Sequence, residues 1–252
     1  MNKNTLAAKI IDVPETASTN KLLRELLVNE KLPEFSLIKT GFQTAGRGQL
    51  GNSWESAKGE NLTFSLVIYP EFLPANRQFL ISEVTALSIK QLLDEFTENI
   101  TVKWPNDIYF EDNKICGMLI ENDLLGDKLC RSIIGIGLNI NQKRFISNAP
   151  NPISLHQITG NTYSLDKLLD RFIELFRNDY QSIKDGKHDT VETAYMNSLY
   201  RKDGFHTFKD KDGEFKASIF GIEPTGHLIL KLSSKEIRRY AFKEVSFVQE
   251  ED

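Results

Sequence analysis

The sequence predicts an α+β protein, in which helices pack on a mixed, mostly antiparallel central sheet and a small β-barrel follows. Two observations lead to this fold class. Strand-like apolar runs and helical segments do not alternate as regular βαβ units through the first 200 residues. From about residue 203, short strand-like runs are separated by turn sequences such as Lys211-Asp212-Gly213. We therefore expect two domains, 1–200 and 201–252.

The elements of the first domain follow from hydrophobic spacing. A helix is expected over 21–29, where four leucines share one face, and strands over 36–43 and 62–69. The clearest helix is 75–96, because its apolar residues repeat at helical spacing. Strands are expected over 100–104, 108–110, 114–120 and 131–140. The polar turn at 111–113 predicts a hairpin that brings Lys114 back near Asp107.

The second half of the chain continues with helices and ends in strands. The polar, proline-containing stretch 141–161 is expected to be an irregular connection, and helices are expected over 165–183 and 190–199. Strands over 215–221, 227–232, 237–242 and near 245–248 predict the small barrel.

Bulk composition restricts the class of protein. A net charge of −4 argues against general nucleic-acid binding, which usually shows as a basic excess. The amino terminus has no apolar core of signal-peptide length, and no run approaches the roughly eighteen apolar residues that a membrane span needs. We therefore expect a cytoplasmic protein with neither nucleic acid nor membrane as a partner. Cys116 and Cys130 lie in apolar runs and are expected to be free core thiols.

The stretch 41–54 carries the first candidate site. It is much longer than a hairpin turn and contains Gly46, Gly48 and Gly51. Glycine permits positive φ and lets backbone N–H groups approach a ligand, so these glycines predict an anion-binding concavity. Arg47 lies between two of them, where a guanidinium would grip phosphate or carboxylate. The alternative is a surface loop with an incidental arginine.

Four motifs in order resemble the biotin protein ligase family, and the resemblance covers about residues 8 to 185 firmly. They are Ser18-Thr19-Asn20, Gly46-Arg47-Gly48, Lys103-Trp104-Pro105-Asn106-Asp107 with Lys114 and Gly117 after it, and Gly135-Ile136-Gly137-Leu138-Asn139. The resemblance implies a class II synthetase-like catalytic domain that binds biotin and ATP in 1–200 and an SH3-like domain in 201–252. Only about ten residues precede the resembling region, so we expect the form without an amino-terminal DNA-binding domain and without a repressor role.

The activity implied by this resemblance has two steps. Biotin and ATP react to biotinyl-5′-AMP, and the biotinyl group then passes to one lysine of the biotin carboxyl carrier domain of a biotin-dependent carboxylase. ATP and Mg²⁺ are the implied cofactors. An exposed edge of the central sheet would permit a homodimer.

The resemblance also assigns residues to roles. Arg47 and Lys114 are the expected catalytic cations, because charge develops on the α-phosphate. Asp107 is a candidate for holding magnesium or for positioning the lysine amine, and the sequence does not choose between these. The expected biotin-binding residues are Ser18, Thr19, Asn20, Gln43, Arg47, Lys114, Gly117, Met118 and Leu119. The expected ATP-binding residues are Gly46, Arg47, Gly48, Gln49, Trp54, Lys103, Asn106 and Asn139.

Several of these residues also have plain structural interpretations. Ser18 or Thr19 is a suitable N-cap for the first helix. Asp107 is a common turn residue, and Asn139 would suit a strand end. Lys114 beside a turn would often be solvated, and the tryptophans at 54 and 104 would suit a core.

One departure from the family pattern, at two positions of the loop, and two competing functions stay open. Many relatives carry arginines where this loop has Gln49 and Asn52, so Arg47 and Lys114 are expected to hold more of the phosphate charge. A lipoate or octanoate ligase would use a related fold and the same adenylate chemistry. A non-catalytic biotin-binding module would bind the vitamin without turning over ATP.

Overall fold

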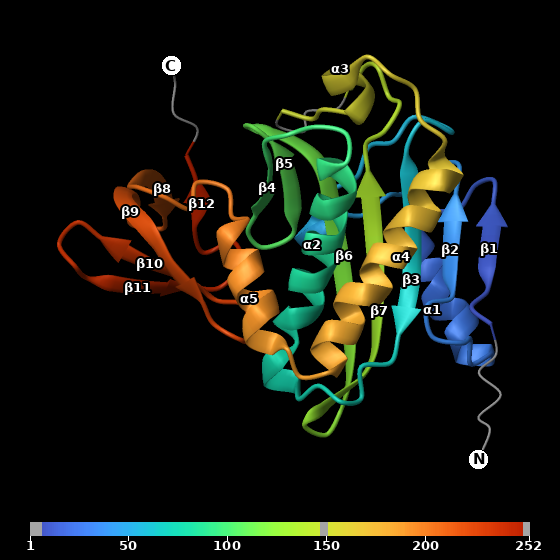
Figure 1. Ribbon diagram of the computed structural model, residues 1–252, viewed down its shortest axis with the longest axis horizontal. Helices are drawn as coiled ribbons and strands as arrows, with labels where there is room; N and C mark the ends of the chain where they lie inside the picture. Colours follow the sequence, from blue (N-terminus) through green and yellow to red (C-terminus); the bar gives the residue numbers. More distant parts are fainter. Residues whose placement is uncertain (1–6, 147–150, 249–252) are drawn as a thin grey trace.

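The larger of two sheets has seven strands in the order β1-β2-β3-β7-β6-β5-β4 (Figure 1). The computed structural model describes residues 7–146 and 151–248. Only β1 and β2 are parallel; the other neighbours are antiparallel, so the predicted mixed sheet is confirmed. The strands are β1 Ile10–Val13, β2 Leu37–Thr40, β3 Leu62–Ile68, β4 Ile100–Lys103, β5 Asp107–Phe110, β6 Asn113–Leu125 and β7 Lys128–Leu138.

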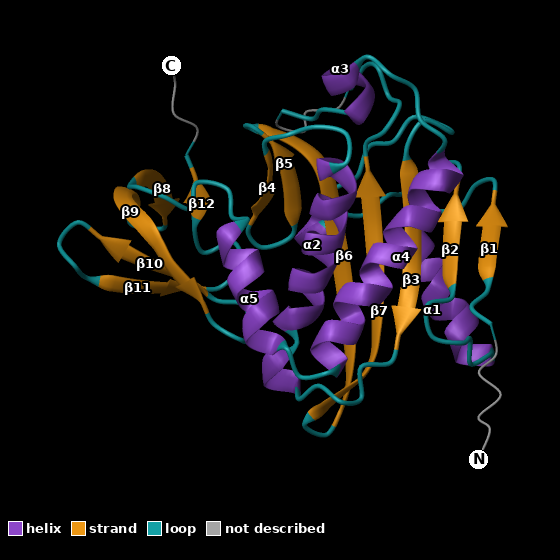
Figure 2. Cartoon of the chain, viewed as in Figure 1, coloured by secondary structure: helices purple, strands orange, loops and turns teal. Residues whose placement is uncertain are grey.

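Helices cover the two faces of this sheet unequally. Helix α1 (Thr19–Asn29) lies on one face, and α2 (Phe79–Asp94) and α4 (Leu165–Lys184) lie on the other, with α5 (His188–Asn197) beside α2 (Figures 1 and 2). Strand alternation explains the division, because successive side chains point to opposite faces. Ile38, Val67 and Ile133 pack with α1 residues in a small cluster, whereas Leu37, Leu66 and Ile134 belong to the large core.

The sequence predictions missed three elements and misjudged one helix. Strand β1 was not predicted because it is a short edge strand with little burial. Helix α3 (Leu155–Thr159) interrupts the expected irregular connection, and β8 (His206–Asp210) was not resolved as a strand. The helix expected over 75–96 is broken, because Ala75–Arg77 is a 3₁₀ turn that follows Pro74 and α2 begins at Phe79.

The carboxy-terminal strands form a five-stranded antiparallel sheet in the order β11-β10-β9-β8-β12. Its other strands are β9 Gly213–Ile222, β10 Leu228–Leu232, β11 Ile237–Tyr240 and β12 Ser246–Phe247. Trp104 joins this sheet to the larger one: its indole N–H donates to the Gly226 carbonyl at 2.9 Å, and its ring meets Phe242 edge to face at 6.2 Å. The core is therefore continuous between the two sheets, and the interpretation of Trp104 as a core residue is confirmed.

Two further findings concern cysteine and the membrane. Cys116 and Cys130 are both free, and burial raises the pKa of the Cys116 thiol, which suits core packing rather than nucleophilic chemistry. Among residues 7–146 and 151–248, no helix has the length and apolar content to cross a membrane.

Candidate active site

Strand register places one row of functional side chains across the uncovered part of the α1 face. Lys103 pairs with Asp107, Asp107 with Gly117, Gly117 with Gly137, and Gly137 with Thr63. Residues opposite one another in a sheet share a face. The shared face is that of α1, because β7 alternates from Ile133 under α1 to Gly137 without a register shift. The two glycines therefore form a floor without side chains of its own, between a charged end and a hydroxyl end.

A cavity of about 290 Å³ lies above this floor. The start of α1, the loop after β2 and the segment before and within β12 enclose it. Its walls include most of the residues expected from sequence: Ser18, Thr19, Asn20, Gln43, Arg47, Gly48, Gln49, Trp54, Lys103, Asn106, Asp107, Lys114, Gly117, Met118 and Leu119. The chain thus brings most of both predicted residue sets, for acid and for nucleotide, into one cavity.

The start of α1 forms a hydrogen-bonding end of this cavity. Gln43 Oε1 accepts from the Thr19 backbone N–H at 2.8 Å and lies 3.2 Å from the Thr19 hydroxyl oxygen. Ser65 Oγ lies 2.7 Å from Thr19 Oγ1 and 2.5 Å from Asn20 Oδ1. Ser18 holds the N-cap position, but its side chain makes no capping hydrogen bond, so helix capping does not explain these hydroxyls.

The opposite end is cationic. Lys114 Nζ lies 2.6 Å from Asp107 Oδ1, which confirms that the hairpin brings these residues together. Lys103 Nζ lies 3.0 Å from the Tyr109 hydroxyl and 4.4 Å above its ring, with Phe247 on another side at 5.4 Å. Burial lowers the pKa of the Lys103 ammonium against the opposing effect of Asp107. Arg47 lies on the exposed rim.

Trp54 lies directly on the glycine floor. A Cβ built on Gly137 would lie 2.3 Å from Trp54 Cε2, and one on Gly117 would lie 3.1 Å from Trp54 Cζ3. Lys114 Nζ is 5.9 Å from the center of the Trp54 ring. Trp54 is thus part of the cavity wall, and glycine at 137 is required by its indole.

The glycine loop differs from the expected anion-binding concavity. The Gly48 N–H donates to the Asn52 carbonyl at 2.7 Å, and the Trp54 N–H donates to the Gly46 carbonyl at 3.0 Å. The loop therefore uses these amides to close on itself as a small hairpin, and they are not free for a phosphate. Only Gly51 of the three glycines has positive φ, at 90°. At Gly46 the reason for glycine is space, since a Cβ would lie 2.6 Å from the Trp54 carbonyl oxygen.

Two predicted nucleotide-binding residues do not line the cavity. Gly46 lies within the loop and packs against the backbone of Trp54. Asn139 is buried, and its side-chain amide donates to the Ile153 carbonyl at 3.0 Å, which anchors the segment before α3. Met118 borders the cavity, but its side chain belongs to the large core.

Sequence reasoning missed other wall residues. Thr63 lines the cavity, and Ser65 lies behind the wall, against Thr19 and Asn20. The two alternate in the otherwise apolar strand β3, and that spacing of two was the available signal. The Thr63 hydroxyl is buried and has no hydrogen-bond partner among the described residues. The end of the chain supplies Phe247 of β12 and, from the segment before it, Phe242 and Val245; local sequence gave no reason to place them here.

Comparisons with known proteins identify the family and the fold of this chain. The sequence model of the biotin/lipoate A/B protein ligase family matches residues 13–139. The bifunctional ligase/repressor BirA of Bacillus subtilis is 27% identical over 221 residues, which are 85% of this chain and 67% of that protein. BirA of Escherichia coli is 31% identical over 133 residues, 52% of this chain and 40% of that protein. The structure of a biotin protein ligase from Aquifex aeolicus in complex with biotin and ATP superposes with a TM-score of 0.78 at 24% identity, covering 96% of this chain and 99% of that one.

Proposed function

The chain belongs to the biotin/lipoate A/B protein ligase family, and from that premise we propose that it is a biotin protein ligase. It activates biotin with ATP to biotinyl-5′-AMP and transfers the biotinyl group to a lysine of a carrier domain. The observation that carries this proposal is the polarity of the cavity. One end has the cations Lys103 and Lys114, Arg47 lies on the exposed rim, and the other end has the hydrogen-bonding side chains of Thr19 and Gln43.

This arrangement matches the two ends of biotin. Its carboxylate must meet the α-phosphate of ATP, and both groups are anionic, so cations are needed where they meet. Its ureido ring carries N–H and C=O groups, which suit the hydroxyl and amide groups near the start of α1. Lipoate and octanoate have no such head group, and the polar end of the cavity would be left without hydrogen-bond partners.

In the first step, a biotin carboxylate oxygen attacks the α-phosphorus, and the bond to pyrophosphate breaks. Lys114 is positioned for this step by its ion pair with Asp107, and Lys103 is held among Tyr109 and Phe247. We assign to both lysines the stabilisation of negative charge on the phosphate oxygens. In the second step, a lysine amine attacks the acyl carbon and AMP leaves.

Magnesium fits the cavity as a companion of ATP. Asp107 is the one carboxylate among the described wall residues, and Mg²⁺ commonly binds one or two carboxylates together with substrate phosphates. Asp107 would hold the ion, which would neutralise polyphosphate charge. The same carboxylate is the candidate for orienting the lysine amine.

The two-domain division is part of the same proposal. We assign residues 1–200 to biotin and ATP binding and 201–252 to a small SH3-like domain. The cavity wall at Phe242 and Phe247 gives the second domain a part in closing the site.

The test is release of pyrophosphate from MgATP with biotin, lipoate or octanoate as the acid. We expect release with biotin alone, together with biotinyl-5′-AMP detected by mass spectrometry. A purified carrier domain should then gain one biotinyl group, and its Lys→Arg variant at the acceptor position should gain none. Release with lipoate or octanoate alone would make the chain a ligase for those acids. Tight biotin binding without release would make it a binding module.

A further inference from the structure

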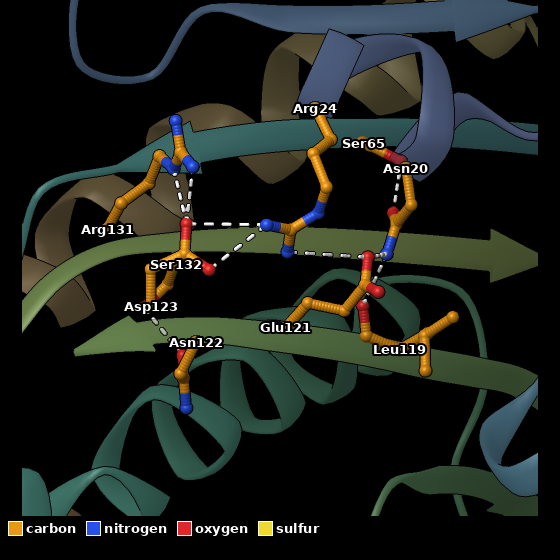
Figure 3. Close-up of polar contacts among 9 residues, drawn as sticks. All are labelled: Asn20, Arg24, Ser65, Leu119, Glu121, Asn122, Asp123, Arg131 and Ser132. Carbon is orange, nitrogen blue, oxygen red and sulfur yellow. Dashed lines mark hydrogen bonds and ion pairs between the residues drawn. The ribbon is translucent and has the colours of Figure 1, made fainter. Parts of the chain in front are cut away.

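A network of polar side chains behind the cavity connects Asn20 to charged residues on β6 and β7 (Figure 3). The Asn20 side-chain amide donates to the Leu119 carbonyl at 3.1 Å and to Glu121 Oε2 at 2.9 Å. Arg24, one turn further along α1, lies 4.0 Å from Glu121 and 3.0 Å from Asp123. The network therefore joins the first two turns of α1 to strand β6.

The hydrogen bonds of Asn20 have a fixed direction. Both partners of its NH₂ group, a backbone carbonyl and a carboxylate, can only accept. The amide oxygen must therefore face Ser65, whose Oγ lies 2.5 Å away. Asn20 is 3% exposed and Ser65 is fully buried, so water does not compete for these groups.

This direction continues to the cavity. Ser65 has one hydroxyl proton and donates it in the hydrogen bond to Asn20 Oδ1, because an amide oxygen can only accept. Ser65 then has no proton left to donate to Thr19. Gln43 Oε1, which lies 3.2 Å from the Thr19 hydroxyl oxygen, cannot donate to it either, because it is an amide oxygen. Thr19 Oγ1 consequently keeps an acceptor lone pair, and Thr19 is one of the residues that line the cavity.

We propose that Glu121 is a positioning residue that, together with the Leu119 carbonyl, sets the direction of this hydrogen-bond chain, so that Thr19 presents an acceptor to the cavity. The site then selects an acid whose far end carries N–H donors. This inference rests on the proposed function and deepens it, because it concerns how the acid is chosen. Gly135 also contributes to the position of Asn20. A Cβ on this residue would lie 2.2 Å from Asn20 Oδ1, so glycine allows Asn20 to lie against β7.

Asp123 provides a matched control from the same strand and face. It lies two residues after Glu121 and binds Arg24 and Arg131, and it is not among the hydrogen-bond partners that Asn20 has within the described part of the chain. Its interactions hold α1 and β7 to β6, whereas the contact of Glu121 with Asn20 acts on the cavity. Variants at the two positions therefore separate loss of packing from loss of positioning.

The experiment measures the dissociation constant of biotin by calorimetry without ATP, and the KM and kcat of adenylate formation, in the full chain. For Glu121→Leu we expect biotin affinity and 1/KM for biotin to fall about tenfold, since a hydrogen bond to a charged partner is lost. The kcat at saturating biotin and the KM for ATP should change little. Glu121→Gln, which keeps an acceptor oxygen, should restore most of the affinity. Gly135→Ala should reproduce the loss by displacing Asn20.

A second experiment measures the affinity for a biotin analogue in which both ureido nitrogens are methylated. The wild type should discriminate strongly against it, and Glu121→Leu should discriminate less. Asp123→Asn should lower the melting temperature and leave biotin affinity unchanged. The inference is overturned if Glu121→Leu binds biotin like the wild type, or if Asp123→Asn loses as much affinity. A wild-type chain that binds no biotin would overturn the proposed function itself, and this inference with it.

Discussion

Replacing Gly137 by alanine should displace Trp54 from the floor of the cavity. The new Cβ would lie 2.3 Å from Trp54 Cε2 and 2.5 Å from Nε1. Carbon atoms in contact prefer about 3.5 Å, so the indole must move by roughly 1.2 Å. Strand β7 cannot yield, because it is paired with β3 on one side and β6 on the other. Trp54 lies on a loop and is the group that moves.

The cost to stability should be modest. Overpacking a core costs about 1–3 kcal/mol, but here the loop gives way. Replacing a glycine in a strand interior by alanine stabilises the folded state by about 0.5–1 kcal/mol. The free energy of unfolding should therefore fall by about 1 kcal/mol. Adenylate formation should fall by more, about tenfold to a hundredfold, because a wall of the cavity shifts by more than 1 Å.

Tryptophan fluorescence can follow the displacement, because the chain has only two tryptophans and Trp104 is 5% exposed. We expect a red-shifted emission and stronger acrylamide quenching in Gly137→Ala. Gly221→Ala is the matched control, since a Cβ at this position in β9 meets no atom within 4 Å. Unchanged emission and quenching together with lost stability would show that the sheet, and not Trp54, had yielded, and would refute the reasoning.

Three further predictions concern charge. Lys114→Ala should reduce pyrophosphate release by a factor on the order of a hundred or more. The free energy of unfolding should fall by only about 1 kcal/mol, because the ion pair of Lys114 with Asp107 is partly exposed. Normal activity of this variant would remove Lys114 from the reacting center. Burial, and then Glu192, raise the pKa of Glu83 from 4.5 to about 8, so the free energy of unfolding should fall as pH rises from 4.5 through 8. Urea titrations of Glu83→Gln should show a flatter dependence over this range and greater stability at pH 8, whereas parallel curves would contradict it. Gln49→Arg should lower the KM for ATP and slow release of the adenylate in a dialysis assay, since it adds a cation to the cavity wall; an unchanged KM would show that its side chain does not reach the phosphates.

Local patterns in the sequence predicted the elements with strong periodicity and the site residues within one hairpin. The polar turn at 111–113 was enough to bring Lys114 to Asp107, because hairpin pairing is local. Helix α3 could have been found, since Ser154 and Gln157 form a capping box and Gly160 ends the helix with φ 75°. Its short length, from Leu155 to Thr159, hid the hydrophobic pattern.

Long-range register was beyond reach of the sequence. The row from Lys103 to Thr63 depends on which residue of β3 meets which residue of β7, and a shift by one residue would turn every side chain to the other face. The approach of Phe247 to Lys103 depends on how the second sheet docks on the first. Neither is encoded in a local pattern. The glycine loop differs from its prediction for another reason. Gly48 was interpreted from its neighbours in sequence alone, whereas in the structure its N–H donates to the Asn52 carbonyl.

The glycines of β6 and β7 explain why the cavity has one fixed side and one movable side. Each leaves space that another side chain of the same chain fills: Asn20 lies over Gly135, and Trp54 lies over Gly117 and Gly137. Asn20 is held by hydrogen bonds to three different residues. The indole N–H of Trp54 has no partner among the described residues, and the backbone hydrogen bonds described for residues 46–54 close this part of the loop on itself. A substrate that needs more room above the floor must therefore gain it at Trp54, while the acceptor pattern near Thr19 stays unchanged.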